Sequence, residues 1–299
     1  MEFSTSDLTN FEYWGTINNP DIVSQYNVHH YIFMPICLYR RSPLWDNSGD
    51  LPCRLNEWLS ARLSLTRLTI KNTLIFGPKN TKLILLFDVI FKDNPLLSQV
   101  VSQLHGINKM SIDIQFIDCR TTDEMSLSEM YAKIVSKSIH KYLETQSQQS
   151  NDIYLLSRLD NDDFLAPKHL QLLNILARMY AYKGLLKNQV LFDFANGLQY
   201  EYDSKMCYST FWPENNFATI GFQANHLSSR DWIVPFSYPH DVVPDNLNKI
   251  DVSTHQPQWI QCIHNQNVAN AIFPWSQQYH SESSLPGLLK SLYFSSSLA

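Results

Sequence analysis

The chain has 299 residues, of which 44% are hydrophobic and 17% charged, and this balance predicts a globular protein with a sizeable core. Its formal net charge of −5 argues against a general nucleic-acid-binding protein, which needs a basic surface to meet phosphate charge. The 5 cysteines form no CxxC pair, the N-terminus lacks the pattern of a signal peptide, and no apolar run reaches the roughly 18 residues of a membrane span. We therefore expect a cytoplasmic protein with reduced thiols, whose membrane contact, if any, is peripheral.

Strands and helices are predicted to alternate along the first half of the chain. Residues 1–29 are polar and aromatic without a clear period, so we expect an irregular extension there, with His29 and His30 at the surface. From residue 30 on, the predicted strands are Tyr31–Leu38, Lys82–Asp88, Ile112–Asp118 and Ile153–Leu156, and the predicted helices are Arg54–Leu74, Asn94–His105, Ser126–Gln146 and Pro167–Leu186. This alternation predicts an α/β fold with a parallel, doubly wound sheet.

The second half of the chain has shorter apolar runs and proline-containing loops. The pattern of strands recurs there, some of them antiparallel, at Val190–Phe194, Met206–Phe211, Ala218–Phe222 and Trp259–Ile263. No composition shift marks a linker at mid-chain. We therefore expect one domain over residues 30–275, with a donor half to about residue 190 and an acceptor half after it, followed by a C-terminal tail over residues 276–299.

Three of the predicted strands end in an aspartate, at Asp88, Asp118 and Asp160. The carboxyl ends of parallel strands meet at one edge of a sheet, and α/β proteins bind their ligands there. We therefore expect these carboxylates to line a nucleotide site. The chain has only 8 glycines and neither a GxGxxG nor a Walker A motif, so a metal ion and side chains must meet the phosphate charge.

The most informative segment is Asp160–Asp163, which carries three carboxylates in four positions directly after a buried strand. Clustered carboxylates raise one another's pKa and need a counter-charge. A divalent cation with oxygen ligands, such as Mg²⁺ or Mn²⁺, supplies that charge and brings substrate phosphates with it. The alternative is that Asp162 or Asp163 caps a helix that is expected to open with Phe164–Pro167.

Around this cluster, the segment Ser157–Leu165 (SRLDNDDFL) resembles the RLDxDD signature of GT-A-type glycosyltransferases. It looks closest to the putative rhamnosyltransferase family of bacterial polysaccharide gene clusters. A second segment, Trp259–Asn270, is similar to that family's W-x-Q-x-x-H-x-x-N stretch, whereas Leu38–Arg41 stands where the family has a TRF-like opening. The resemblance covers roughly residues 30–275. It implies a GT-A fold, with a mixed, mainly parallel sheet flanked by helices, and metal-dependent transfer of a sugar such as L-rhamnose.

The resemblance also implies roles for single residues. Asp160 would contact the nucleotide-sugar donor, with Arg158 of the same signature beside it. The expected ligands of Mn²⁺ or Mg²⁺ are Asp160, Asp162, Asp163 and His264. For His264, the alternative is a hydrogen-bonded structural histidine. The expected partners are a nucleoside-diphosphate sugar and a glycan or other hydroxyl acceptor.

Inverting transfer also needs a carboxylate that takes the acceptor's hydroxyl proton while the nucleoside diphosphate leaves. Asp231 and Asp241 are the candidates, because both follow the acidic cluster within the acceptor half. Asp231 is preferred, since Trp232 beside it would form a platform for the acceptor; its alternatives are a helix cap or a partner of Arg230. A different class of function is a catalytically silent GT-A-like domain that binds a glycan or a partner protein.

Overall fold

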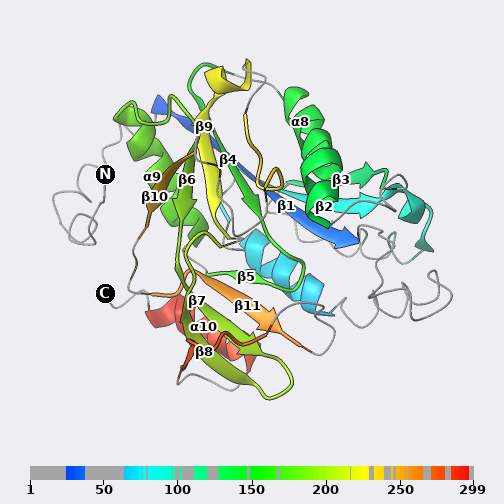
Figure 1. Ribbon diagram of the computed structural model, residues 1–299, viewed down its shortest axis with the longest axis vertical. Helices are drawn as coiled ribbons and strands as arrows, with labels where there is room; N and C mark the ends of the chain where they lie inside the picture. The colour runs from blue at the N-terminus through cyan, green and yellow to red at the C-terminus, as the bar shows by residue number, and fades with distance from the viewer. Residues whose placement is uncertain are drawn as a thin grey trace.

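The computed structural model describes residues 25–37, 64–75, 77–78, 80–95, 97, 102, 111–119, 127–146, 149–166, 169–215, 217–228, 232–238, 244, 247–252, 254, 256–264, 271–279 and 284–295. These residues form two β-sheets with helices packed against them (Figure 1). Among the described helices, none has the length and the apolar run that crossing a membrane requires.

The larger sheet has seven strands in the order β10-β6-β9-β4-β1-β2-β3. Neighbouring strands are parallel except at β9, which runs antiparallel to both β4 and β6. The expected α/β fold, with a mixed, mainly parallel sheet flanked by helices, is confirmed. The strands are β1 (Asn27–Cys37), β2 (Thr81–Asp88), β3 (Ser111–Ile117), β4 (Asp152–Arg158), β6 (Val190–Asp193), β9 (Thr219–Gln223) and β10 (Asn248–Asp251).

The first strand begins earlier than its apolar pattern predicts. β1 pairs with β4 from Asn27 onward, so the last residues of the expected extension belong to the sheet. His30 is only 2% exposed, and its Nε2 atom lies 2.7 Å from Oγ of Ser157, so the expected surface position of His30 is wrong. A buried hydroxyl on the neighbouring strand gives the imidazole a polar partner, and nothing near His30 in the sequence indicates it.

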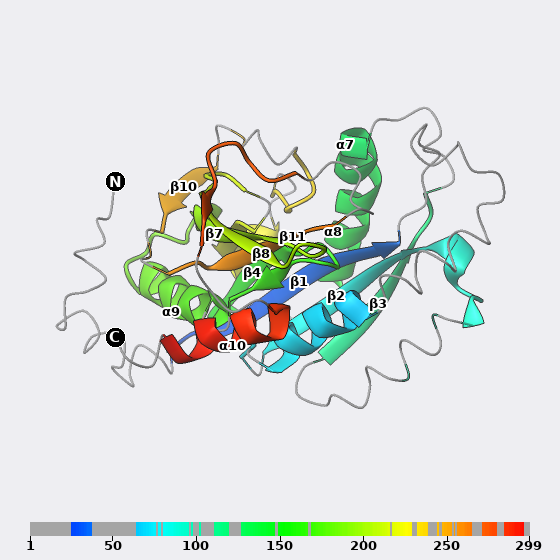
Figure 2. The ribbon, with the colours of Figure 1, turned by 90° about the horizontal axis from the view of Figure 1, so that it is seen from below.

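Helices cover both faces of the main sheet, as Figure 2 shows. One face packs against α9 (His169–Tyr182) and the helix over residues 64–75, through side chains that include Ile70, Leu173 and Leu176. The other face packs against α8 (Ser136–Glu144), through Ile139 and Leu143. The predicted helix Asn94–His105 and the start of the predicted helix Arg54–Leu74 lie largely outside the described residues.

The predicted helix Ser126–Gln146 is present, but one turn of it is wider than an α-helical turn. α7 (Leu127–Met130) continues into a π-helical segment, Tyr131–Val135, and then into α8. In the π-helical segment the N–H of Ser136 donates to the carbonyl of Tyr131, five residues back. The hydroxyl of Ser136 donates to the same carbonyl at 3.1 Å. Single π-helical turns of this kind often occur at functional sites.

The residues after the acidic cluster form a strand and not the start of a helix. β5 (Phe164–Leu165) pairs antiparallel with β11 (Trp259–Ile263), and α9 begins only at His169. Backbone pairing with β11 accounts for the difference, because it satisfies the polar groups of two residues whose side chains are buried. Asp162 and Asp163 therefore do not cap a helix, and that alternative for the acidic cluster is wrong.

The smaller sheet has five strands in the order β12-β8-β7-β11-β5. It includes β7 (Asn196–Glu201), β8 (Met206–Phe211) and β12 (Gln277–Gln278). β7, β10 and β12 are not predicted by the sequence pattern. Residues 276–299, expected as a tail, contain β12 and α10 (Leu285–Ser295), which packs on this sheet through Leu285, Leu288 and Leu289.

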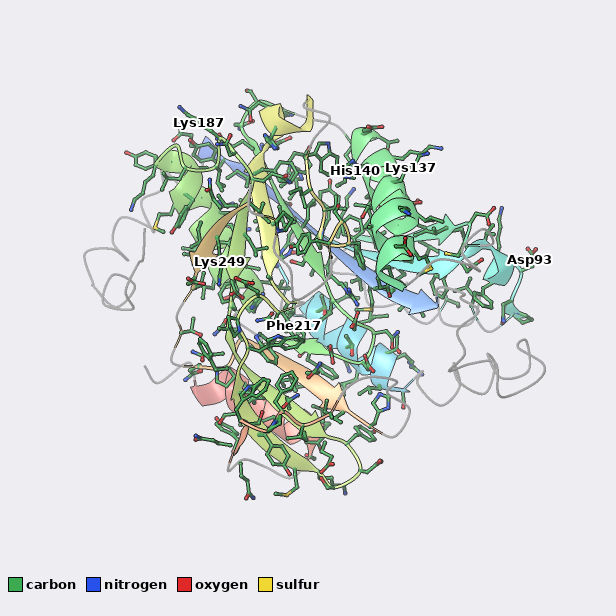
Figure 3. All side chains as sticks on the ribbon, viewed as in Figure 1. Asp93, Lys137, His140, Lys187, Phe217 and Lys249 are labelled. Atoms are coloured by element: carbon green, nitrogen blue, oxygen red, sulfur yellow. The ribbon has the colours of Figure 1, made fainter. Side chains whose placement is uncertain are left out.

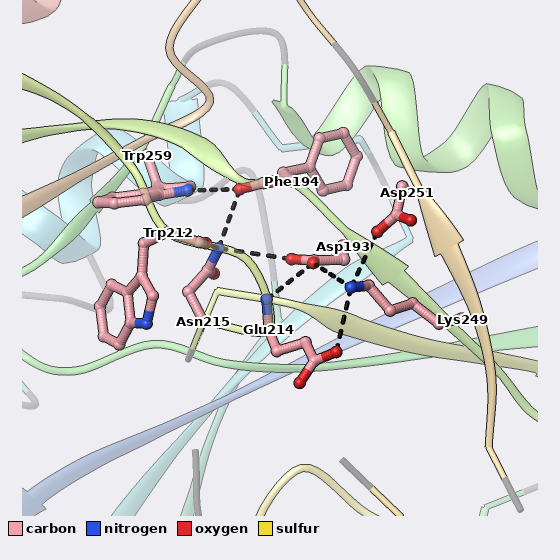
Figure 4. Close-up of polar contacts among 8 residues, drawn as sticks. All are labelled: Asp193, Phe194, Trp212, Glu214, Asn215, Lys249, Asp251 and Trp259. Carbon is pink, nitrogen blue, oxygen red and sulfur yellow. Dashed lines mark hydrogen bonds and ion pairs between the residues drawn. The ribbon is translucent and has the colours of Figure 1, made fainter. Parts of the chain in front are cut away.

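A polar network around the buried Asp193 lies where the chain passes from β6 of the main sheet to β7 of the smaller sheet (Figure 4). Asp193 accepts the N–H of Glu214 at 2.7 Å, and Nζ of Lys249 lies 3.5 Å from its Oδ2 atom. Lys249 also contacts Glu214 at 3.1 Å and Asp251 at 3.0 Å. Burial raises the pKa of Asp193, and the Glu214 N–H and the Lys249 ammonium oppose that shift. The network therefore ties β6, β10 and the loop after β8 together.

Trp259, the first residue of β11, packs at the same junction. Its indole N–H donates to the carbonyl of Phe194 at 2.6 Å, and its ring stacks on Phe217 at 4.6 Å. Figure 3 shows Phe217 between the two sheets. Gly197 lies against the indole so closely that a Cβ atom there would be 2.1 Å from the ring. β7 therefore needs a glycine at this position.

Candidate active site

The acidic cluster lies in a tight turn that joins β4 to β5. The N–H of Leu159 donates to the carbonyl of Phe33 at 3.1 Å, and the side-chain amide of Asn161 donates to the carbonyl of Pro35 at 2.9 Å. Both acceptors are near the end of β1. Two parallel strands therefore hold the turn at the carboxyl edge of the main sheet, which is where ligands bind in folds of this class.

Asp160 is held by Arg158 of the preceding strand. Nε of Arg158 donates to Oδ1 of Asp160 at 3.1 Å, and Nη2 donates to Oδ2 at 3.4 Å. This is the forked geometry in which arginine binds carboxylates most strongly. The Arg158 side chain is 8% exposed and that of Asp160 is 30% exposed. The arginine therefore orients a carboxylate that still has one open side.

Asp162 meets His264 across the molecule. Oδ2 of Asp162 lies 3.0 Å from Nε2 of His264, although 102 residues separate them in the chain. The pairing of β5 with β11 brings them together, because each residue lies next to one of these strands. β11 therefore lies beside the acidic cluster, and its end residues Trp259 and Ile263 are both buried.

Asp163 points into the protein. It is 1% exposed, and its Oδ1 atom accepts the N–H of Cys262 at 2.9 Å. Its Oδ2 atom has no hydrogen-bond partner within the described part of the chain. Burial raises the pKa of Asp163 well above its usual range, and the charges of Asp162 and Asp160 raise it further. The Cys262 N–H and Arg158 shift that pKa in the opposite direction.

Asp88 and Asp118 lie along the same edge of the main sheet, because β4, β1, β2 and β3 are parallel neighbours. Asp88 ends β2 and is fully buried, whereas Asp118 follows β3 and is exposed. The thiol of Cys119 hydrogen-bonds to Asp88, and burial, followed by the charge of Asp88, raises the pKa of this thiol to about 12. Of the two aspartates, only Asp118 presents its side chain to solvent.

The two candidate bases, Asp231 and Asp241, lie outside the described residues. Between them, residues 232–238 are described. Trp232 is 4% exposed and stacks on His140 at 4.0 Å, so its ring is covered by α8, and the expected acceptor platform at Trp232 is wrong. Figure 3 labels His140 on α8. From sequence alone, an aromatic residue next to a polar one fits either an acceptor platform or a core position. For Trp232, the packing on α8 shows that it is a core residue.

Two residues that the sequence pattern does not single out contact the site. The ring centroids of Tyr131 and Phe236 lie 5.0 and 5.1 Å from Cζ of Arg158. Tyr131 falls within an ordinary amphipathic helix pattern, and Phe236 within a proline-containing loop. Nothing local in the sequence indicates that either ring contacts an arginine 27 or 78 positions away.

Among the described residues, no group of three or more His, Cys, Asp and Glu side chains is arranged to hold a metal ion. The pair Asp162–His264 nevertheless has the chemistry and spacing of two such ligands. The 3.0 Å between Oδ2 of Asp162 and Nε2 of His264 is a hydrogen-bond distance, and it also allows both atoms to reach one metal ion with bonds of about 2.1 Å. One carboxylate and one imidazole suit Mn²⁺ better than Mg²⁺, which prefers oxygen ligands.

Comparison with known families matches residues 118–276 to a family described as "Putative rhamnosyl transferase". The match covers just over half of the chain and includes β4, the acidic cluster and His264. No curated protein matches the chain. Among solved structures, the chain is similar to the crystal structure of a putative nucleotide-diphospho-sugar transferase from Desulfovibrio desulfuricans G20, with 12% identity, coverage of 78% of this chain and 80% of that chain, and a TM-score of 0.33.

Proposed function

Since this chain belongs to the putative rhamnosyl transferase family and is a glycosyltransferase, we propose that it moves a sugar from a nucleoside-diphosphate donor to a hydroxyl group of a glycan acceptor. The family's description makes L-rhamnose the first sugar to test. The observation that carries the proposal is the contact between Asp162 and His264, next to the open side of Asp160. A carboxylate and an imidazole from distant segments meet at the edge of the sheet where nucleotides bind.

Asp162 and His264 are the residues that would hold the metal ion. Mn²⁺ or Mg²⁺ bound there would neutralise charge on the diphosphate as the bond to the sugar breaks. Two protein ligands leave room for phosphate oxygens and water, which is the usual arrangement when a metal ion binds together with a nucleotide. Metal and diphosphate should therefore bind cooperatively.

The other residues of the cluster take different roles in this proposal. Asp160, oriented by Arg158, would accept hydrogen bonds from hydroxyl groups of the donor. The exposed side chain of Asp118 would add a second contact along the same edge. Asp163 would act indirectly by holding β11 in place, and Asp88 would act only through Cys119, because both carboxylates are buried.

Transfer with inversion would follow from a single displacement at the sugar's anomeric carbon. The acceptor hydroxyl attacks that carbon, the bond to the diphosphate oxygen breaks, and a carboxylate takes the hydroxyl proton. Asp231 and Asp241 are the proposed bases. Their variants Asp231→Asn and Asp241→Asn separate the two, because the true base should lose turnover and keep donor affinity.

Thermal unfolding with Mn²⁺ and a panel of UDP, dTDP and GDP tests donor binding. A nucleotide that binds the native state raises the melting temperature, because it stabilises the fold by RT ln(1 + [L]/Kd). We expect one diphosphate to do so only when Mn²⁺ is present, and we expect Asp162→Asn and His264→Gln to abolish the effect.

Asp93→Asn is the matched control for the aspartate variant, because Asp93 is exposed at the far edge of the main sheet (Figure 3). It should respond like the unmodified protein. If no diphosphate raises the melting temperature of the wild-type protein, the proposal of a nucleoside-diphosphate donor is wrong. The alternative of a silent glycan-binding domain would then take its place.

A further inference from the structure

The guanidinium group of Arg158 lies over two neighbouring aromatic rings, those of Tyr131 and Phe236. Its Cζ atom is 5.0 Å from the centroid of Tyr131 and 5.1 Å from that of Phe236, and the two rings are themselves 5.3 Å apart. These distances are within the range of cation–π contacts, and such contacts are stronger away from water. Arg158 is 7% exposed. The rings therefore restrict a side chain that otherwise has many rotamers.

Tyr131 reaches Arg158 from the first position of the π-helical segment. The wider turn is stabilised by two hydrogen bonds to the Tyr131 carbonyl, from the N–H and from the hydroxyl of Ser136. An inserted residue of this kind changes which side chains share a helix face. Burial raises the pKa of Tyr131, so its phenol stays neutral and the face of the ring is what Arg158 meets.

Phe236 contacts Arg158 from the segment over residues 232–238, which hydrogen bonds hold in place. Gln189 exchanges two hydrogen bonds with the backbone of Ile233, at 2.8 and 2.6 Å. The hydroxyl of Ser237 donates to that of Ser136 at 3.3 Å, and this bond joins the segment to the end of the π-helical turn. Phe236 itself is 1% exposed. The two rings therefore belong to elements that are bonded to each other.

We propose that Tyr131 and Phe236 are positioning residues of the donor site, which hold Arg158 so that its fork fixes the carboxylate of Asp160. This inference rests on the donor role proposed for Asp160. It also links the two sides of the reaction, because the segment that carries Phe236 begins one residue after Asp231 and ends three residues before Asp241.

The first test needs no donor and reads the arginine directly. In protein labelled with ¹⁵N-arginine, the Nε–Hε signal of Arg158 is identified by its loss in Arg158→Lys. Ring currents from the two rings beneath the guanidinium should shift that signal away from the ordinary arginine position. Tyr131→Leu and Phe236→Leu should each return it toward that position, and Tyr131→Phe should leave it unchanged. An Arg158 Nε–Hε signal at the ordinary arginine position in the wild-type protein would show that the guanidinium does not lie against the two rings.

The second test measures affinity for the diphosphate that binds best, UDP or dTDP, by calorimetry with Mn²⁺. Loss of one ring should weaken binding about tenfold, the effect of a desolvated cation–π contact, while Tyr131→Phe stays within about twofold. Phe192→Leu, the same change at a buried ring on the opposite face of the main sheet, controls for general destabilisation. At a temperature where Phe192→Leu is folded, its affinity for the diphosphate should equal that of the wild-type protein.

The two failures can be told apart. If the wild-type protein binds a diphosphate and both leucine variants bind it equally well, the positioning role is wrong and the proposed function stands. If no diphosphate binds but the arginine signal responds to both rings, the contact of Arg158 with the two rings exists, and the positioning role of the rings in a donor site is overturned.

Discussion

The carboxylate of Asp163 accepts the backbone N–H of Cys262 at 2.9 Å, across 99 residues of chain. This bond joins the turn after β4 to the middle of β11. Asp162 precedes Asp163 by one residue and His264 follows Cys262 by two, so the bond fixes the register at which the proposed metal ligands meet. If Asp162 and His264 hold a metal ion as proposed, the buried carboxylate of Asp163 determines where they meet.

The first prediction concerns this bond. Asp163→Ala leaves the N–H of Cys262 buried and unsatisfied, so the free energy of unfolding should fall by about 1–3 kcal/mol. Asp163→Asn keeps the acceptor oxygen and should preserve that bond. Chemical denaturation of both variants, with diphosphate affinity measured alongside, checks this. Equal stability of the alanine and asparagine variants would mean that the bond contributes nothing.

Its pH dependence has a definite sign. Because the folded pKa of Asp163 is raised, its contribution to stability is fully present below the unfolded value of 3.8 and is lost as pH rises through the folded value. The side-chain amide introduced by Asp163→Asn never ionises. The Asp163→Asn variant should therefore gain stability relative to the wild type as the pH rises from about 4 to 7.

The second prediction concerns Asp162 and His264 as a unit. Each of Asp162→Asn and His264→Gln should weaken Mn²⁺-dependent diphosphate binding by about tenfold or more, with little loss of stability. If both hold one ion, the double variant should be only slightly worse than either single variant. Calorimetric affinities for the four proteins complete the cycle. Fully additive losses would indicate separate roles, and a loss of stability without loss of affinity would make His264 structural.

The third prediction follows from two buried histidines, His30 in β1 and His169 at the start of α9. Burial lowers the pKa of His30 and of His169 from 6.5 to about 3, and the charge of His30 adds to the shift of His169. Their contribution to stability is therefore present above pH 6.5 and is lost as the pH falls toward 3. Each should add a slope of up to about 1.4 kcal/mol per pH unit in that window.

Replacement of His169 isolates its share of that slope. Neither of its ring nitrogens has a hydrogen-bond partner among the described residues, and its ring lies 4.5 Å from that of Phe194. His169→Phe should therefore be at least as stable as the wild type at pH 7 and should lose less stability at pH 5. Urea denaturation at both pH values measures the difference. Parallel losses in the two proteins would contradict the prediction.

The fourth prediction concerns the contact between Gly197 and Trp259. Because an added Cβ atom would lie 2.1 Å from the indole, Gly197→Ala must displace either β7 or the start of β11. Overpacking of this kind costs about 1–3 kcal/mol. If β11 moves, His264, which follows its other end, moves with it, so diphosphate affinity should fall as well. Gly184→Ala, at a surface turn after α9, should lose stability through its positive φ and keep its affinity. Unchanged diphosphate affinity in Gly197→Ala would show that the displacement near Trp259 does not extend along β11 to His264.

The donor side of the fold could be predicted from sequence because its signals are local. The buried runs of β2 and β4 and the long helix before β4 have patterns that match their structures within a few residues. The acidic cluster follows β4 directly, so its place at the edge of the sheet needs only the parallel topology.

The remaining features depend on contacts between distant segments, and no local pattern encodes these. β5 is two residues long and exists only because β11 pairs with it, so its sequence looks like the start of a helix. β7 contains a buried glutamine, Gln199, whose side-chain amide donates a hydrogen bond to Gln261 at 2.8 Å. This polar residue interrupts the apolar pattern by which a buried strand is predicted. Tyr131, at the start of the π-helical segment, contacts Arg158 across 27 residues of chain.

The position of β9 has a consequence for synthesis of the protein. β9 lies between β4 and β6, yet Thr219, which faces Ser157 of β4, follows it by 62 residues. While the ribosome is adding those residues, β4 has one hydrogen-bonding edge without its strand. Open edges of apolar strands recruit other chains. We therefore expect a polypeptide that stops near residue 190 to aggregate instead of folding, so residues 30–190 should not yield a free-standing fragment.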